Sequence, residues 1–483
     1  MSSVTLRRSF IVSGRGGRLQ TTSCQWMARP TRLGHRRLSA RASRAACGWV
    51  VLSLLVNAPV LLARPPNLIL VLADDLGYEC LSVNGSDSYR TPYLDRLAEQ
   101  GARFTECHVL PLCTPTRVEI LTGLSGVRHY TQFGKIHPDV PTIAQRLKAA
   151  GYATAAVGKW QLGHDPDLPR RLGFDEYYLW QHTRRPPRYA NPGLELNGIQ
   201  QDFNSGEYGP DLLNAYAREF VSKRRAEPFF LYYPMLLVHA PFQPPPNHPD
   251  WDPTARGEEQ SNPTYFKAMV EYMDQLVGRL VDTVDRDGLA TNTVIIFLAD
   301  NGTSGSIATQ WNGQLYRGGK GQTTRRGTHV PLIVRWTGSI APGQVVSSLV
   351  GAVDVPASLL DFAGVQPNPS DPLDGRSFGP MLLTGRAQPA RDVLYTWYCP
   401  RPGQTALREW AVTTEWKLYA SGELYRWCED FDEQRPVSRE QLDPPTRRCI
   451  QRLEEELHRW REIHRPEVPT QSKEPRNRKG GRT

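Results

Sequence analysis

Long apolar runs are absent from the 483-residue sequence: none reaches the roughly 18 residues that a membrane-spanning helix requires, so no stable span is expected. Cysteine is scarce, and none of the eight lies in a Cys-x-x-Cys or Cys/His spacing typical of a zinc site. Lysine is rare, with nine against 49 arginines. The composition, 39% hydrophobic and 22% charged, is globular and excludes disorder, collagen or a small disulfide scaffold as a description of the whole chain.

Excess positive charge is missing from the body of the chain, although the net charge is +9. Residues 1–63 hold ten arginines and no acidic residue, and residues 466–483 are also basic, which leaves residues 64–465 slightly acidic. Binding to the phosphate backbone of a nucleic acid requires a basic surface. No nucleic-acid partner is therefore expected.

The two ends of the chain differ in composition from the rest. Arginines between residues 29 and 44 precede an apolar stretch at Trp49–Ala63, the order typical of a secretory signal. We interpret residues 1–63 as a basic N-terminal region with a signal peptide and expect a periplasmic or secreted protein. A buried core helix is the alternative, and Met27 is an alternative start. Residues 466–483 are polar and predict a disordered tail.

Six of the cysteines lie beyond residue 63. In an exported protein such cysteines can form disulfide bonds. Proximity in the sequence suggests the pairs Cys80–Cys107 and Cys428–Cys449 as a hypothesis.

Two segments, Asn67–Ala73 and Thr293–Ala299, are so continuously apolar that they predict strands buried on both faces, as in a parallel sheet. Further strand and helix patterns alternate along the chain. Strands are expected at 152–157, 229–238 and 331–336, and helices at 91–99, 141–150, 263–287 and 355–362. The alternation predicts an α/β sandwich over residues 64–388, with a mixed, mostly parallel sheet flanked by helices.

Short strands with tight turns follow residue 388. They are expected at 393–398, 410–414 and 416–419, with a helix at 450–460, and together predict a smaller α+β domain at 389–465. Five tryptophans of this domain indicate core packing, with stacking on sugar rings as the alternative. They are Trp397, Trp410, Trp416, Trp427 and Trp460.

Acidic and amide side chains follow both of the very apolar strands. Asp74 and Asp75 come directly after the first strand, and Asp300 and Asn301 directly after the second. Ligands of open α/β sheets gather where the carboxyl ends of strands meet, and four oxygen-bearing side chains there would suit a hard divalent cation. The alternative is an ordinary Asp-Asn-Gly turn and a solvated Asp-Asp strand end.

Cys113 opens the motif Cys-Thr-Pro-Thr-Arg. Pro115 suits the first turn of a helix, which would place Cys113 at the helix N-terminus, where the dipole favours a nucleophile or an anion. Arg117 would lie one turn further along on the same side. A buried cysteine before an ordinary helix is the alternative.

With these motifs the chain resembles the formylglycine-dependent sulfatases of the alkaline phosphatase superfamily. The resemblance spans roughly residues 66–425, and the motifs stand in the order of that family. They are NLILVLADDLG (67–77), CTPTRVEILTG (113–123), GKWQLG (158–163), LGFDEYY (172–178), VHAPFQPP (238–245), ADNG (299–302), GGKGQTTRRGTHVPLIVRW (318–336), VDVPASLLDFAG (353–364) and WKLYASGELY (416–425).

The resemblance implies hydrolysis of sulfate esters, with a sulfated carbohydrate as the expected substrate. It implies one Ca²⁺ ion held by Asp74, Asp75, Asp300 and Asn301 together with the modified side chain of Cys113. That modification is oxidation to formylglycine by the formylglycine-generating enzyme, for which Cys113, Pro115 and Arg117 form the recognition signal. One hydroxyl of the hydrated aldehyde would attack sulfur and expel the alcohol, and the other would lose its proton as sulfate leaves and the aldehyde reforms.

The resemblance also implies roles for four cationic or titratable residues. Arg117 and Lys159 would hold the diol and the sulfate. His239 and Lys320 would contact the sulfate and protonate the departing oxygen. Lys159 and Lys320 stand in glycine-rich motifs, where a compact charge that can give up a proton is not replaceable by arginine. Taken alone, each would be a surface lysine, and His239 a structural histidine.

Three departures from the family pattern bear on the site. Gln161 stands where the family usually has a histidine that helps to hold a formylglycine hydroxyl. Thr116 stands where serine is common, which should still allow the modification. Arg325 and Arg326 occupy a stretch that is often acidic, and one hypothesis is that they extend the anion site toward further sulfates or carboxylates of the substrate.

A polar insertion at 181–197 contains His182 and Arg188 and could either line the pocket or form a solvated loop. Two other functions remain open. One is a phosphodiesterase or phosphonate monoester hydrolase on the same scaffold. The other is a non-catalytic binder of sulfated glycans, which Gln161 would favour.

Overall fold

The computed structural model describes residues 64–463 except 256–260, 369–370, 372 and 385–390. The expected signal peptide at 1–63 and the expected tail at 466–483 lie outside these residues. Among the helices of the described part, none is long and apolar enough to cross a membrane.

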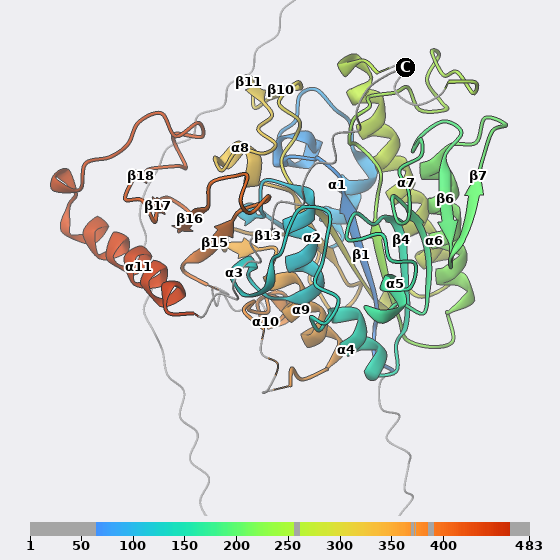
Figure 1. The fold of residues 1–483 in the computed structure, drawn as a ribbon, viewed down its shortest axis with the longest axis horizontal. Coiled ribbons are helices and arrows are strands. Elements are labelled where there is room, and N and C mark those ends of the chain that lie inside the picture. The colour runs from blue at the N-terminus through green and yellow to red at the C-terminus, as the bar shows by residue number, and fades with distance from the viewer. Residues whose placement is uncertain (1–63, 256–260, 369–370, 372, 385–390, 464–483) are drawn as a thin grey trace, which may run out of the picture. The chain divides into compact units, whose positions relative to one another are not determined.

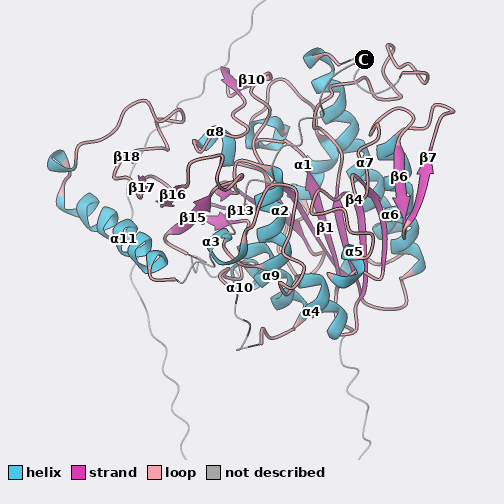
Figure 2. Cartoon of the chain, in the orientation of Figure 1, coloured by secondary structure: helices cyan, strands magenta, loops and turns pink. Residues whose placement is uncertain are grey.

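A mixed, mostly parallel sheet of ten strands forms the centre of the protein (Figures 1 and 2). In order across the sheet, its strands are β13 (Gln344–Val346), β2 (Ala102–Phe104), β12 (Leu332–Arg335), β9 (Thr293–Ala299), β1 (Asn67–Ala73), β8 (Phe229–Pro234), β4 (Ala153–Lys159), β5 (Glu176–Trp180), β6 (Gly193–Leu196) and β7 (Ile199–Asp202). The five central strands from β9 to β5 are parallel, whereas β12 and the hairpin β6–β7 are antiparallel to their neighbours.

The apolar composition of the central strands follows from their burial. Every residue of β1 and of β9 is buried, which agrees with the prediction of strands covered on both faces. Gly158 allows β4 to pass close to β8, because a Cβ at this position would lie 1.9 Å from the carbonyl oxygen of Pro234. β8 ends at Pro234, earlier than expected, and the chain turns away toward His239.

Helices cover the sheet in two groups (Figures 1 and 2). One group comprises α1 (Pro92–Glu99), α6 (Gly209–Lys223) and α7 (Phe266–Arg286), which contact one another and the strands β12, β4 and β8. The other comprises α2 (Cys113–Thr122), α4 (Ile143–Ala149) and α9 (Asp354–Ala363). Shorter helices are α3 (Gly126–His129), α5 (Leu168–Arg171), α8 (Arg325–Thr328) and α10 (Gly379–Thr384), with 3₁₀ turns at Tyr78–Cys80, Ser82–Asn84, Pro263–Tyr265, Ala290–Asn292 and Arg439–Gln441.

Helix α2 is buried on all sides, since each of its ten residues is buried. Pro115 stands in its first turn, and Gly123, in the left-handed conformation with φ 71°, ends it. The helix packs against α3, α4 and α9. Its N-terminal residue, Cys113, is therefore buried in the core.

The C-terminal part forms a four-stranded antiparallel sheet of β15 (Leu394–Tyr398), β16 (Arg408–Val412), β17 (Lys417–Tyr419) and β18 (Leu424–Tyr425). Helix α11 (Pro444–Arg461) packs on this sheet. Of the five tryptophans, four are buried and Trp416 packs partly buried against the core, which confirms the packing interpretation. Two small pairs complete the fold: β3 (Cys107–His108) with β14 (Val350–Gly351), and β10 (Ala308–Trp311) with β11 (Gln314–Arg317).

The suggested disulfide bonds are wrong. All six cysteines of the described chain are free. Cys80 lies 3.2 Å from the hydroxyl of Thr303, and Cys107 is buried in β3, so closeness in sequence does not bring their sulfur atoms together. Cys428 and Cys449 are partly exposed and also unpaired.

Candidate active site

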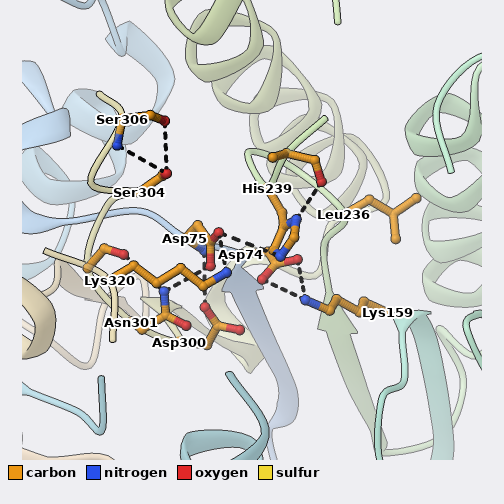
Figure 3. A network of polar contacts seen from close by, with 12 residues as sticks. Asp74, Asp75, Lys159, Leu236, His239, Asp300, Asn301, Ser304, Ser306 and Lys320 are labelled. Carbon is orange, nitrogen blue, oxygen red and sulfur yellow. Dashed lines mark hydrogen bonds and ion pairs between the residues drawn. The ribbon is translucent and has the colours of Figure 1, made fainter. Parts of the chain in front are cut away.

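Four oxygen-bearing side chains meet at the carboxyl edge of the sheet (Figure 3). Asp74 and Asp75 follow β1, and Asp300 and Asn301 follow β9. The two strands are adjacent, parallel and in register, with Ala73 opposite Ala299, so the residues after them are neighbours. All four are at most 2% exposed. The interpretation of Asp-Asp as a solvated strand end is therefore wrong.

Two hydrogen bonds connect the residues of the acidic group. The backbone N–H of Asp75 donates to Asp300 Oδ1 at 3.1 Å, and Asn301 Nδ2 donates to Asp75 Oδ1 at 2.9 Å. Asp75 has φ 64°, a left-handed conformation that non-glycine residues adopt at a cost and that is common at functional sites.

Three cations pair with the three carboxylates. Lys159 Nζ, at the end of β4, lies 2.9 and 2.6 Å from the two oxygens of Asp74, and Lys320 Nζ lies 2.6 Å from Asp75 Oδ2 (Figure 3). Arg117 binds Asp300 Oδ2 through Nε at 3.0 Å and Nη2 at 2.8 Å. Its Nη1 donates to the carbonyl oxygen of Lys159 at 3.0 Å, which ties α2 to β4.

These charges set the ionisation of the acids. Burial opposes the charge of Asp74, but Lys159, His239 and Arg117 outweigh it and hold the pKa of Asp74 well below its ordinary value. For Asp75 burial is likewise outweighed, by His239 and Lys320, and its pKa is lowered. Burial and the neighbouring Asp74 raise the pKa of Asp300 to about 7. The raised pKa of Asp300 thus follows from its burial beside a second carboxylate, although Arg117 is bound to it.

Cys113 lies directly against the acidic group. Its Sγ atom, a carboxylate oxygen of Asp74 and one of Asp300 all lie within 4.8 Å of one another. Burial raises the pKa of the Cys113 thiol, and Lys159 only partly offsets this. An unmodified Cys113 would therefore be a protonated thiol, which is a poor nucleophile.

His239 lies on the loop after β8 and reaches the same edge. Its Nδ1 donates to the carbonyl oxygen of Ala240, and its Nε2 lies 3.7 Å from Asp75 Oδ2. Burial lowers the pKa of His239 to about 4, although Asp75 and Asp74 raise it. At neutral pH the ring is uncharged, and with Nδ1 as the donor its Nε2 presents a lone pair.

The oxygens at this edge fit a hard divalent cation. Asp74, Asp75, Asp300 and Asn301 supply carboxylate and amide oxygens, the ligands that Ca²⁺ prefers. Asn301 Oδ1 is buried without a hydrogen-bond partner among the described residues, although its Nδ2 makes two hydrogen bonds. Buried polar atoms are normally satisfied, so an unpaired oxygen beside three carboxylates indicates a ligand for a cation.

The predicted residues of this edge are thus brought together, whereas Arg325 and Arg326 are not part of it. Arg325 binds Glu106 through both Nη atoms at 3.0 and 2.8 Å, and Arg326 pairs with Asp432. Both guanidinium groups also contact aromatic rings. Their role as an extension of the anion site is not supported, because their partners, Glu106 and Asp432, are not residues of this edge.

Of the two candidate residues in the insertion after β5, one lies in the core and the other lies near the acidic group. His182 is 1% exposed and packs edge-on against the rings of Trp160 and Tyr177, so it is a core residue. Arg188 instead lies at the carboxyl edge of the sheet, with Nη1 3.9 Å from Asp74 Oδ2. The loop is therefore not simply solvated.

The sequence did not predict a hydrogen-bond network that supports the four candidate metal ligands. Thr303 accepts a hydrogen bond from the backbone N–H of Gly77 at 2.9 Å and donates to Glu79 at 2.5 Å. Glu79 is 3% exposed, and burial raises its pKa. The network joins the loops after β1 and β9. The only signal in the sequence was the position of Thr303 directly after the Asp-Asn-Gly motif.

Comparison with known proteins agrees with this site. A family model described as sulfatase matches residues 66–365, and a model of the C-terminal part of N-sulphoglucosamine sulphohydrolase matches residues 323–462. The chain is 31% identical to N-acetylgalactosamine-6-sulfatase of Sus scrofa over 79% of each protein, and 34% identical to arylsulfatase A of Bos taurus over 70% of this chain and 71% of that protein. The crystal structure of Ps i-CgsB in complex with k-i-k-neocarrahexaose matches with a TM-score of 0.69 and 26% identity, covering 82% of this chain and 93% of that one.

The fold and the acidic sheet edge define a hydrolase of the alkaline phosphatase superfamily. The chain belongs to the sulfatase family, because the family model covers more than half of its residues. It is accordingly a sulfuric ester hydrolase, and the interpretation as a non-catalytic binder is not supported.

Proposed function

We propose that the protein hydrolyses the sulfate ester of a carbohydrate with a formylglycine derived from Cys113 and one Ca²⁺ ion. The observation that supports this proposal most directly is the position of Cys113 Sγ. It lies at the N-terminus of α2 and within 4.8 Å of carboxylate oxygens of Asp74 and Asp300. The names of the relatives, which include N-acetylgalactosamine-6-sulfatase, support a sugar substrate.

The two absent groups would supply distinct chemistry. Formylglycine would supply a hydrated aldehyde as the nucleophile, and Ca²⁺ would supply positive charge for the nucleophile and for the sulfate oxygens. Asp74, Asp75, Asp300 and Asn301 would hold the ion. The Cys-x-Pro-x-Arg pattern supports modification by the formylglycine-generating enzyme.

The side chains around these groups would bind and orient the sulfate. Lys159 Nζ lies at the bottom of the site, 1% exposed, where it can donate to the nucleophile or to a sulfate oxygen. Lys320 is more accessible, with a side chain 21% exposed, and Asp75 and Asp74 raise its pKa despite its burial. Lys320 therefore stays charged and can donate to the sulfate or to the departing alcohol oxygen.

His239 would have a second role at the same place. With Nδ1 donating to the Ala240 carbonyl oxygen, its neutral ring offers Nε2 to a proton. A proton taken up there could be returned to the leaving alcohol. The side chain of Tyr189 holds this loop in position, because its hydroxyl lies within hydrogen-bond distance of the carbonyl oxygens of Leu236 and His239.

Two measurements test the proposal. Peptide mass spectrometry across Cys113, on protein purified from its own host, should find formylglycine, whereas an unmodified thiol would contradict the proposed nucleophile.

Paired assays should find Ca²⁺-dependent cleavage of sulfate esters in preference to phosphate diesters and phosphonate monoesters. Faster cleavage of the phosphorus esters would instead favour the alternative phosphodiesterase function.

We also propose that the protein is exported, and that its N-terminal region, catalytic domain, smaller C-terminal domain and tail meet at residues 63, 388 and 465. The order of basic and apolar residues at 1–63 supports a cleaved signal. N-terminal sequencing of the mature protein is the test, and a mature chain that begins at Met1 or Met27 would contradict it.

A further inference from the structure

Arg188 is a buried arginine at the carboxyl edge of the sheet, and the resemblance to the family assigns no role to it. It lies in the loop between β5 and β6, and it is 7% exposed. Its guanidinium carbon lies 4.0 Å from the centre of the Trp180 ring, the last residue of β5. Stacking on an indole fixes the plane of a guanidinium group. The side chain is thus positioned rather than free to move into solvent.

The free end of this side chain faces the reacting groups. Nη1 lies 3.9 Å from Asp74 Oδ2, the oxygen that Lys159 Nζ approaches to 2.6 Å. This Nη1 is buried and has no hydrogen-bond partner among the described residues. Buried donors are normally satisfied, and an unpaired one in a charged group is especially unfavourable. Such a donor beside a sulfate site indicates an anionic acceptor.

Arg188 differs in this respect from the other cations of the edge. Lys159, Lys320 and Arg117 each approach a carboxylate oxygen to 2.8 Å or less. Three carboxylates are thereby matched by three cations before Arg188 is counted. The guanidinium group of Arg188 is a surplus positive charge, which a bound Ca²⁺ ion would increase and a sulfate would neutralise.

The strand that precedes Gln161 is paired with the strand that precedes Arg188. Gln161, which stands in place of the usual histidine, follows β4, and the N–H of Trp160 donates to the carbonyl oxygen of Trp180 at 3.1 Å. This bond joins the ends of β4 and β5, so Gln161 and the loop that carries Arg188 lie at the same edge. A glutamine amide can donate a hydrogen bond but brings no positive charge.

We propose that Arg188 is a substrate-binding residue that donates from Nη1 to an oxygen of the sulfate group being transferred. The inference rests on the proposed function. The ligand is the reacting sulfate itself and not a second anionic group on the substrate.

Arg188→Gln and Arg188→Lys test this assignment, with Arg184→Gln as the matched control. Arg184 belongs to the same loop, but it pairs with the exposed Asp202. Steady-state kinetics would use 4-nitrophenyl sulfate, which carries one anionic group, and a disulfated disaccharide. Isothermal calorimetry with inorganic sulfate and the Ca²⁺-loaded protein would report binding without turnover. Melting temperatures would exclude variants that do not fold.

A charge-assisted hydrogen bond to sulfate predicts losses of about 10- to 100-fold in kcat/KM for Arg188→Gln, equal on both substrates. Sulfate affinity should fall about tenfold or more, Arg188→Lys should restore part of both, and Arg184→Gln should match the wild type. Unchanged kinetics and sulfate affinity in Arg188→Gln, or losses confined to the disulfated substrate, would overturn the inference. A wild-type enzyme that binds sulfate through Arg188 but cleaves no sulfate ester would instead refute the proposed function.

Discussion

Lys159 Nζ donates to both carboxylate oxygens of Asp74, with the lysine side chain 1% and the aspartate 0% exposed. The pair connects the end of β4 to the end of β1, two strands separated in the sheet by β8. Loss of one partner of a buried ion pair leaves the other charge without compensation. Removal of either partner alone should therefore destabilise the fold as well as disturb the site.

Lys159→Met is expected to destabilise the protein by about 3–5 kcal/mol when Ca²⁺ is removed, because the buried Asp74 loses its partner. Urea unfolding in a chelator measures this change. Lys148→Met is the matched control, since Lys148 forms a 2.6 Å pair with Asp175 at the surface and should cost about 1 kcal/mol or less. Equal losses in the two variants would contradict the structural role of the Lys159 pair.

Binding of Ca²⁺ should raise the melting temperature, because three carboxylates converge and a ligand that binds only the folded state stabilises it. At a concentration 100 times Kd the gain is about 2.7 kcal/mol. Asp300→Asn should abolish most of this gain, since it removes a charged ligand. Asp165→Asn, which changes an exposed aspartate paired with Arg171, should retain it. A melting temperature that does not respond to Ca²⁺ would count against the proposed ion.

Much of the site could be predicted because its signals are local. The strands β1 and β9 are continuous apolar segments, and the residues that follow them carry the acidic groups. Parallel neighbours bring these ends together whatever the rest of the fold does. The Cys-x-Pro-x-Arg motif likewise specifies a helix start within five residues.

Arg188 and Arg325 could not be placed in this way, because their partners are distant in the sequence. Arg188 lies beside Asp74, which precedes it by more than 100 residues, and Arg325 pairs with Glu106, 219 residues away. Motif position suggested the pocket for Arg325, and the sequence left open whether Arg188 is solvated. Tertiary packing placed Arg325 away from the expected position. It placed Arg188 beside Asp74, for which the sequence held no local signal.

The different surroundings of Arg325 and Arg326 predict different costs of substitution. Arg325 is buried and makes two hydrogen bonds to Glu106, whose side chain is 17% exposed. Arg325→Gln should therefore cost about 2–4 kcal/mol in unfolding free energy. Arg326 pairs with Asp432, which is 49% exposed, and Arg326→Gln should cost about 1 kcal/mol or less. Neither should change the preference between mono- and polysulfated substrates, and a selective loss on polysulfated ones would restore the anion-site hypothesis.

Glu119 on α2 predicts a pH dependence of stability that is separate from catalysis. Burial raises the pKa of Glu119 from 4.5 to about 8, with Asp374 and Asp354 adding to the shift and the N–H of Gly126 and the Arg391 charge opposing it. Between pH 4.5 and 8 the folded protein therefore binds a proton that the unfolded chain releases. The contribution of Glu119 to stability therefore falls as pH rises through this window.

Glu119→Gln keeps the shape of the side chain and its acceptor for the Gly126 N–H but cannot ionise. Its melting temperature should be close to that of the wild type near pH 5 and should exceed it by a growing margin toward pH 8, because only the wild type carries the cost of a buried carboxylate. Thermal unfolding at half-unit steps of pH measures the difference. The exposed Glu455→Gln on α11 serves as the control and should show no such trend. A difference between Glu119→Gln and the wild type that is constant with pH would mean that Glu119 is ionised in the folded protein.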